Sequence, residues 1–252
     1  MNVAPDPVEV IRAEALAGLP HGFLGRRGGV STGIHAGLNV GLGSNDDRDA
    51  VHENRRRAVA AVKPGAKLAT VHQIHSAIAV VAEAFPDDAR PHADALVTDR
   101  PDLLLGVLAA DCVPILFADA QAGVVGAAHS GWKGSIGGVS LATIEAMERL
   151  GADRGRIAAA VGPCIGRASY EVDDGFLARF VAEDPENERF SSPGAPATTS
   201  STSRPMWSRA SRRRGCGASR HSASTPTRLT TASSAIAARR IAASRDTGGR
   251  SR

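Results

Sequence analysis

A change in composition near residue 190 limits how much of this 252-residue chain can fold. Residues 191–252 include 12 arginines, no lysine and one acidic residue, Asp246. The formal charge of this segment is therefore +11, and because the whole chain carries +4, the segment 1–190 carries −7. The basic segment is rich in serine and threonine and has no helical or strand periodicity. We expect a folded domain over 1–190 and a disordered, low-complexity basic tail over 191–252.

The segment 1–190 alternates short apolar runs with amphipathic helical patterns. A glycine-rich loop is expected over 21–43, and helices over 47–62, from a glycine-rich entry at 134–138 through 150, and over 173–182. The apolar runs predict strands over 8–11, 77–82, 95–98, 103–108, 113–117, 124–128 and 157–161. Most of these runs are continuous, which is typical of strands buried on both faces. The pattern predicts sheets covered by helices rather than an open barrel.

Several protein classes are disfavoured by composition. The chain is 42% apolar, enough for a core. It contains no run of about 18 apolar residues and begins without a basic-then-apolar signal sequence, so we expect a cytoplasmic protein with no membrane span. Its cysteines form no disulfide framework, which leaves thiol or metal chemistry open: Cys112, Cys164 and Cys216.

Soft or borderline metal ligands follow apolar runs at three places. They are His72 with His75, Cys112, and His129. Two imidazoles and a thiolate suit Zn²⁺, and a fourth position left open is typical of a catalytic site. Taken singly, each residue is more often a buried cysteine or a satisfied histidine than a metal ligand. Spacing does not decide between these interpretations, because the ligands come from separate segments.

Other candidates stand near the same turns. Asp94 could be a general base, a partner of a ligating histidine, or an ordinary turn residue. Arg26, Arg27 and Lys133 place cations beside glycine backbone, as a phosphate group needs, although solvated loops also explain them. Cys164 lies in a turn that could be functional or simply packed. No phosphate-loop or dinucleotide motif is present.

Eight short motifs follow one another in a characteristic order along residues 20–182. They read HGFLGRRGGVS at 21–31, GLNVG at 37–41, ENRRR at 53–57, QIHS at 73–76, ADALVT at 93–98, ADCVPIL at 110–116, AHSGWKG at 128–134 and GPCIG at 162–166. This series resembles the bacterial YfiH-like laccase-domain family, whose members are variously labelled polyphenol oxidases, peptidoglycan-editing factors and purine nucleoside phosphorylases.

The resemblance implies a fold, a metal and an activity. The fold is α+β, a single domain of mixed β-sheets packed together and flanked by helices. The metal is zinc, held by His75, Cys112 and His129, with His72 a near neighbour. The activity is phosphorolysis of adenosine, inosine and methylthioadenosine, accompanied by adenosine deamination; copper-dependent phenol oxidation is the older attribution. We expect Cys112, Asp94, Lys133 and Arg27 to carry catalysis, with the cations holding phosphate and Asp94 assisting deamination.

Alternatives from other classes remain open. The tail charge would suit a nucleic-acid-binding arm, but stacking aromatics are nearly absent from it. We therefore expect small-molecule partners, purine nucleosides and phosphate, and neither nucleic acid nor membrane. Cys112 with His129 as base would instead suit a hydrolase that edits the cell wall. A metal-free, inactive relic is the third alternative.

The tail departs from the family, whose members end with a motif like Phe-Phe-Ser-Tyr-Arg-Arg. That motif, written in G/C-rich codons and read one base later, gives Ser-Ser-Ala-Ile-Ala, the string at Ser233–Ala237. A Gly-His-His-Gln-Phe-Asp-Leu segment read in the same shifted frame gives the string at Pro196–Ser203. Two agreements in one phase predict a frameshift at about Phe190–Ser192. No function is assigned to Cys216, His221 or the tail arginines.

Overall fold

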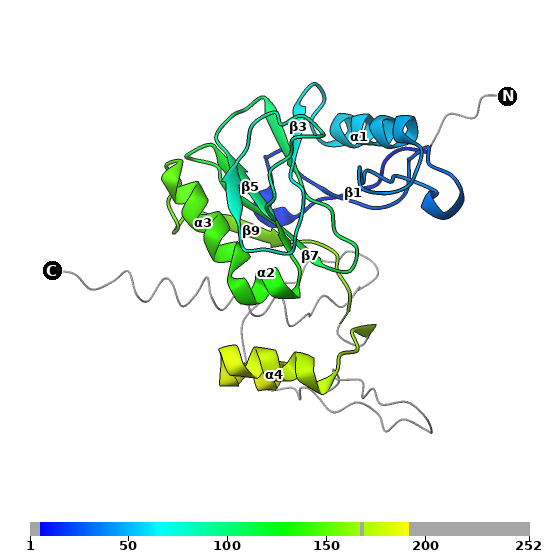
Figure 1. Ribbon diagram of the computed structural model, residues 1–252. Helices are drawn as coiled ribbons and strands as arrows, with labels where there is room; N and C mark the ends of the chain where they lie inside the picture. Colours follow the sequence, from blue (N-terminus) through cyan, green and yellow to red (C-terminus); the bar gives the residue numbers. More distant parts are fainter. Residues whose placement is uncertain (1–5, 167–168, 192–252) are drawn as a thin grey trace. The chain divides into compact units, whose positions relative to one another are not determined.

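A computed structural model of the chain describes residues 6–166 and 169–191 (Figure 1). Backbone contacts divide the chain into two compact units, Met1–Pro163 and Cys164–Arg252. The first unit is built on a five-stranded sheet of order β4-β5-β8-β7-β9. Its strands are β4 Ala79–Val81, β5 Ala95–Thr98, β7 Val113–Asp119, β8 Val124–Ser130 and β9 Ala158–Val161. Only the β4/β5 pair is parallel; the other pairs are antiparallel.

Two smaller sheets accompany it. β1 (Val10–Ile11) pairs antiparallel with β2 (Phe23–Leu24), and β3 (Lys67–Thr70) pairs parallel with β6 (Leu103–Gly106). Parallel and antiparallel pairs thus occur together, with helices beside them, which confirms the predicted mixed α+β class. β2 and β3 were not predicted. β2 lies inside the segment expected to be loop, and β3 has a lysine and a threonine where a buried strand would have apolar residues.

Three α-helices belong to the first unit: α1 (Arg48–Val62), α2 (Trp132–Gly137) and α3 (Val139–Arg149). The Asp47 side chain caps α1 by accepting a hydrogen bond from the Ala50 N–H at 2.8 Å. The prediction of one helix entered through 134–138 was wrong. The glycine-rich segment is itself helix α2, and Gly138, at φ 87°, separates it from α3 because glycine adopts the left-handed conformation without a Cβ clash. Short 3₁₀ turns, η1 (Glu14–Leu16) and η2 (Gly33–His35), complete the unit.

The core lies on both faces of the central strands. α3 packs across β4, β5 and β8, and it approaches β8 so closely that a Cβ at Gly126 would lie 3.0 Å from Thr143 and 3.1 Å from Met147. Leu96 of β5 joins a buried cluster with Ala69 and Leu103 from the β3/β6 sheet. All four residues of β5 are buried, as predicted for a strand covered on both faces. β4, β6 and β9 are only partly buried.

The described part of the second unit is helical. α4 (Asp174–Glu183) begins at Asp173, whose side chain accepts from the Phe176 N–H at 2.7 Å, close to the predicted bounds. A 3₁₀ segment, η4 (Pro185–Phe190), follows, and buried Asn187 donates to the Phe180 carbonyl at 2.9 Å. The predictions for the tail beyond residue 191, Cys216 and His221 included, lie outside the described residues. No helix in the described part of the chain is long and apolar enough to cross a membrane.

Candidate metal centre

The sheet topology gathers the candidate ligands at one end of the five-stranded sheet. Cys112 immediately precedes β7, and His129 lies near the end of β8, opposite Pro114 in the antiparallel register. Asp94 precedes β5, which runs antiparallel to β8, so the start of β5 also meets the end of β8. His75 lies in the loop between β3 and β4. Segments far apart in sequence therefore converge on one position.

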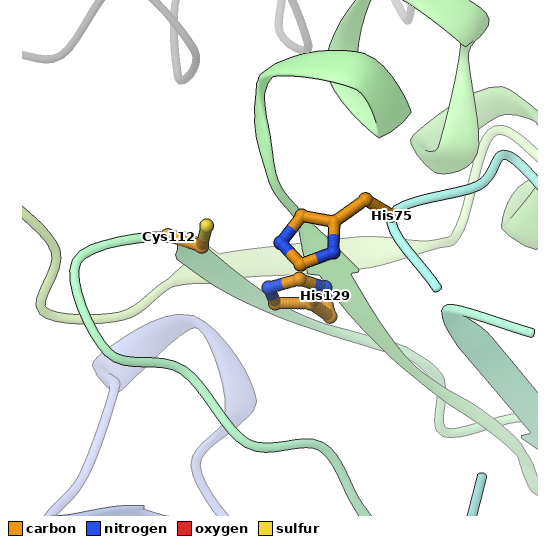
Figure 2. Close-up of side chains that lie close together, drawn as sticks. All are labelled: His75, Cys112 and His129. Atoms are coloured by element: carbon orange, nitrogen blue, oxygen red, sulfur yellow. The ribbon is translucent and has the colours of Figure 1, made fainter. Parts of the chain in front are cut away.

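Three of these side chains form a cluster that could hold a metal ion. The ligand atoms of His75, Cys112 and His129 all lie within 4.8 Å of one another, and the two imidazole rings meet edge to face with centroids 4.9 Å apart (Figure 2). Ligand atoms around a tetrahedral zinc ion are about 3.3–3.8 Å apart, so small side-chain adjustments would close the site. Within residues 6–166 and 169–191, this is the one group of three or more such side chains.

Gly131 keeps the space between the ligands open. This residue stands at the N-cap of α2, directly after β8. A Cβ at this position would lie 2.7 Å from the His75 ring and 3.3 Å from the Cys112 sulfur. Any side chain would intrude among the ligands. Both the donor set, two imidazoles and one thiolate, and the reserved space fit a zinc ion.

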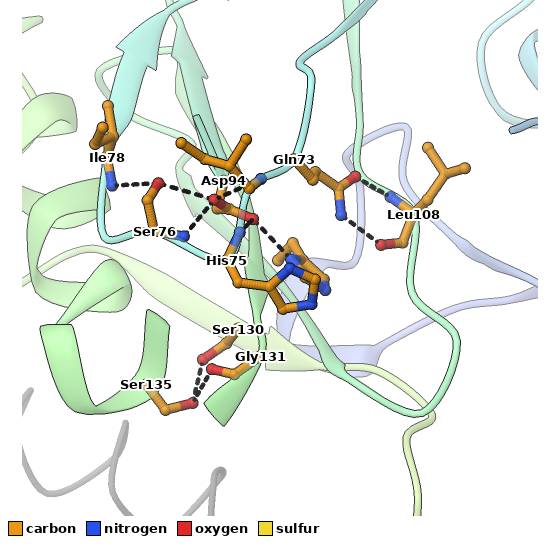
Figure 3. Close-up of polar contacts among 11 residues, drawn as sticks. Gln73, His75, Ser76, Ile78, Asp94, Leu108, Ser130, Gly131 and Ser135 are labelled. Atoms are coloured by element: carbon orange, nitrogen blue, oxygen red, sulfur yellow. Dashed lines mark hydrogen bonds and ion pairs between the residues drawn. The ribbon is translucent and has the colours of Figure 1, made fainter. Parts of the chain in front are cut away.

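Asp94 connects two of the three ligands through its buried carboxylate (Figure 3). Its Oδ1 lies 2.9 Å from His129 Nδ1 and accepts from the His75 N–H at 3.0 Å. Its Oδ2 accepts from the Ser76 N–H and hydroxyl, at 2.6 and 2.8 Å, and from the Ile74 N–H at 3.2 Å. An ionised carboxylate can only accept, so the proton of His129 resides on Nδ1 and Nε2 stays free for a metal.

This environment favours one of the roles considered for Asp94. The side chain is fully buried and both of its oxygens are engaged. A carboxylate without an open face positions the ligands, whereas a general base must reach the substrate. Of the three roles left open by the sequence, the contacts therefore support the partner of a ligating histidine.

Burial and hydrogen bonding set the charge states at the centre. Burial alone would raise the pKa of Asp94, but hydrogen bonds from Ser76, His129 and Ile74 outweigh it and lower the pKa. Burial lowers the pKa of His129, opposed by its bond to Asp94, and this shift favours the neutral imidazole that a metal ligand must be. Burial, followed by the charges of Asp111 and Asp94, raises the pKa of the Cys112 thiol. Such a thiol is a poor free nucleophile without a nearby cation or metal.

Backbone strain also concentrates at the centre. Among the described residues other than glycine, His75 (φ 60°) and Asp111 (φ 71°) have positive φ angles. One is a candidate ligand and the other directly precedes a candidate ligand. Such conformations persist where surrounding contacts fix them, here in part through the bond from the His75 N–H to Asp94.

The other predicted residues lie outside the cluster. His72 is exposed, its ring meets that of His92 at a tilt of 42° with the centroids 4.7 Å apart, and it does not belong to the ligand group. Arg27 is exposed, and the Lys133 ammonium lies 5.5 Å from the Trp132 ring centroid. The polar contacts of the described residues do not join Arg27 or Lys133 to the three ligands.

Arg26 and Cys164, also singled out from the sequence, do not belong to the ligand group either. Arg26 donates to the Ala36 carbonyl at 2.8 Å, which ties its side chain to its own loop. Cys164 begins the second unit and is described apart from the first.

Sequence reasoning missed three residues that shape the centre: Gln73, Ser76 and Gly131. Gln73 and Ser76 flank His75 in the QIHS motif, and Gly131 lies in AHSGWKG. The only sign in the sequence that these residues matter was their place in motifs that also contain candidate ligands. Their contacts depend on loops meeting in space, which one sequence does not show.

The chain matches known proteins over most of its length. Residues 20–212 match the family model described as multi-copper polyphenol oxidoreductase laccase. A purine nucleoside phosphorylase of Deinococcus radiodurans is 47% identical over 174 residues, covering 69% of this chain and 67% of the relative. Another, of Streptomyces coelicolor, is 40% identical over 187 residues, covering 73% and 77%.

Solved structures agree with these matches. YlmD from Geobacillus stearothermophilus aligns with a TM-score of 0.63 at 33% identity, covering 77% of this chain and 73% of that one. A Neisseria meningitidis protein of the DUF152 family aligns with a TM-score of 0.60 at 36% identity, covering 69% and 68%.

Proposed function

Because the chain belongs to the laccase-like family described above, and relatives within it are named purine nucleoside phosphorylases, we propose that it is a zinc-dependent purine nucleoside phosphorylase. The proposed substrates are adenosine, inosine and methylthioadenosine, with adenosine deamination as an accompanying activity. The observation that carries the proposal is the cluster of His75, Cys112 and His129 around the space kept open by Gly131.

Two features of the described residues favour zinc over copper. In the described part of the chain, one three-residue group offers a place for one ion, whereas a multi-copper oxidase needs several. A mononuclear blue-copper site would use the same two histidines and cysteine with a weak axial methionine. The one methionine in the described residues, Met147, is instead buried in α3 against Gly126. Copper-dependent phenol oxidation is therefore the second choice.

We propose different roles in phosphorolysis for different residues of the chain. The reaction passes through an oxocarbenium-like state, so phosphate must lie close to the sugar while the purine departs. The exposed cations Arg27 and Lys133 are proposed to bind phosphate, and Asp94 to orient the His129 imidazole and to hold the backbone of His75. Cys112 contributes a thiolate ligand. A bound Zn²⁺ ion would supply Lewis acidity.

Under this proposal the partners are small molecules rather than nucleic acid or a membrane. The segment 1–190 carries a formal charge of −7, which repels a polyanion, and the net positive charge is confined to the tail. The proposed location is the cytoplasm, where nucleosides and phosphate are available.

Phosphate-dependent release of hypoxanthine from inosine tests the proposal. We expect the full chain to bind zinc stoichiometrically and to release hypoxanthine. Cys112→Ala and His129→Ala should each lose the metal and reduce turnover by two orders of magnitude or more, roughly the loss of one catalytic group. The matched control is His72→Ala, because His72 is an exposed histidine on the loop that carries His75. This variant should retain both the metal and the turnover. Normal turnover in both ligand variants would refute the metal-dependent mechanism.

A cysteine hydrolase is the alternative that the geometry also allows, because the Cys112 sulfur lies within 4.8 Å of imidazole nitrogen. Metal analysis separates the two functions. Zinc bound through Cys112 leaves no free thiolate, whereas a hydrolase would be alkylated at Cys112 at the same rate with and without zinc.

A further inference from the structure

Gln73 joins the two loops that carry metal ligands. Its Nε2 donates to the Leu108 carbonyl at 2.7 Å, and its Oε1 accepts from the Leu108 N–H at 2.8 Å (Figure 3). Both hydrogen bonds reach one residue, 35 positions away in sequence. A side-chain amide has the same donor and acceptor as a peptide group, so Gln73 pairs with Leu108 as a neighbouring strand would.

This pairing extends the β3/β6 ladder toward the metal centre. The backbone register of the two strands ends at Thr70 opposite Gly106. Gln73 and Leu108 lie just beyond these two ends, so the amide continues the connection where the strands separate. His75 follows Gln73 by two positions, and Cys112 follows Leu108 by four. The two hydrogen bonds thus join the loops shortly before each reaches its ligand.

The hydrogen bonds of Asp94 do not hold all three ligands, so the pairing of Gln73 with Leu108 can hold the loop before the third. Asp94 holds His75 and His129, but its hydrogen bonds do not include Cys112. Cys112 is instead preceded by Asp111 in the left-handed conformation, which is costly unless the surrounding loop is held. A buried carboxylate therefore holds the backbone of His75 and the ring of His129, whereas Cys112 is positioned by β7 on one side and by residues 107–111 on the other.

We propose that Gln73 is a positioning residue of the metal centre, whose amide sets the distance between the Cys112 thiolate and the His75 imidazole. The inference rests on the metal site of the proposed function but concerns a residue that would touch neither metal nor substrate. Its effect should appear in metal affinity and in the geometry of the sulfur ligand, before any turnover.

Gln73→Met keeps the length of the side chain and removes both hydrogen bonds. The matched control is Gln121→Met, an exposed glutamine in the turn between β7 and β8. Zinc affinity of the full chain would be measured by competition with a chromogenic chelator. Loss of a partner that orients a ligand lowers metal affinity about 10–100-fold, so we expect a loss of that size in Gln73→Met and none in Gln121→Met.

Cobalt substitution supplies a signature that a general loss of stability would not produce. The thiolate-to-cobalt charge-transfer band should weaken or shift in Gln73→Met at a temperature where the metal-free variant is still fully folded, so that the lower stability from the two lost hydrogen bonds does not account for it. Gln73→Glu is the second variant: it keeps the acceptor for the Leu108 N–H and loses the donor. Its affinity should be lower than that of the unsubstituted chain.

Wild-type zinc affinity and an unchanged cobalt spectrum in both Gln73 variants would overturn the inference. Failure of the unsubstituted chain to bind zinc is a different result, because it would remove the proposed metal function itself. If Gln73→Met does not fold, Gln73→Glu decides the question by the same two measurements.

Discussion

At the scale of single residues, two positions that are not metal ligands shape the centre. Asp94 does so with a carboxylate that accepts five hydrogen bonds, and Gly131 does so by having no side chain. Both sit beside ligands and neither offers an atom to the metal. The centre therefore depends on its surroundings as much as on its three ligands.

Gly131→Ala should weaken metal binding without unfolding the protein. Its backbone, at φ −69° and ψ 169°, suits alanine, so the cost comes from the new methyl group. That methyl would lie 2.7 Å from the His75 ring and displace it. We expect zinc affinity to fall about tenfold or more, measured by chelator competition. Gly43→Ala, where a Cβ meets nothing within 4 Å, is the control, and equal affinities would contradict the steric argument.

The three ligands could be chosen from the sequence because the motifs fixed which histidines and cysteine to consider. The choice of His75 over His72 rested on family resemblance, and the structure agrees, since His72 pairs with His92 instead. The roles of Asp94 and Gly131 could not be settled in advance. They depend on distances between a loop, a strand end and a helix start, which are set only when the chain folds.

At the scale of elements, helix α1 organises the glycine-rich loop. Asn54, fully buried, accepts from the Val30 N–H at 2.8 Å and donates to the Ser31 hydroxyl and the Asn39 carbonyl at 2.8 and 2.9 Å. Arg57 donates to the Gly28 carbonyl at 3.1 Å. The ENRRR motif thus holds the loop that carries Arg27, the proposed phosphate-binding residue.

Asn54→Leu should loosen this loop while leaving the helix intact. The substitution removes several buried hydrogen bonds and leaves loop groups unsatisfied, which costs about 2–4 kcal/mol of unfolding free energy. If Arg27 binds phosphate, KM for phosphate should also rise more than kcat falls. Arg56→Ala is the control, because Arg56 is exposed and contacts only Glu53 by ion pairing. An unchanged phosphate KM in Asn54→Leu would separate the loop from phosphate binding.

Asp119 ties the β7–β8 turn to the segment before β9. It is buried, and hydrogen bonds from the Asp153 N–H and from Arg156 lower its pKa to about 2. A lowered pKa means that the ionised form stabilises the fold. This contribution is complete above the unfolded value of 3.8 and is lost as pH falls toward about 2.

Asp119→Asn should therefore destabilise the protein at neutral pH and much less in acid. Urea unfolding across this pH range would measure the difference from the unsubstituted chain. The exposed Asp88→Asn supplies the control. A difference that does not shrink with acidification would show that ionisation of Asp119 is not its source.

The expected bounds of β5, α1 and α4 agree with the structure to within one residue, whereas β2, β3 and the boundary between α2 and α3 were missed. β5 was predicted at its observed bounds, because a continuous apolar run between polar turns has one simple interpretation. The split between α2 and α3 was missed, since glycine both permits a helix and ends one, and only Gly138 adopts the left-handed conformation there. β3 was missed because its burial comes from β6, a partner distant in sequence.

At the scale of the whole molecule, charge divides the chain into a body of −7 and a segment of +11. We propose that the second part results from a shifted reading frame beginning near Phe190. In the described residues, β9 forms an edge of the main sheet, and Val161 on it is 38% exposed. The Phe-Phe-Ser-Tyr-Arg-Arg motif at the family's C-terminus would then be lost from a chain read in this frame.

Restoring the frame should raise both stability and phosphorolysis relative to the present chain. Sequencing the codons for residues 188–194 is the direct measurement. A single intact frame in independent reads would reject the proposal, as would a frame-restored chain no more stable or active than the present one.

Deleting residues 191–252 should abolish any salt-dependent DNA affinity, because all of the excess positive charge lies there.

The position of the metal centre along the chain has a genetic consequence. The codons of the ligands and of Asp94 and Gly131 all lie before the end of the first unit at Pro163, and hence well upstream of the proposed frameshift near Phe190. A lesion at the junction leaves every ligand codon untouched. A gene damaged in this way would continue to specify a metal-loading centre while its turnover falls, so metal content and enzymatic activity would decline separately.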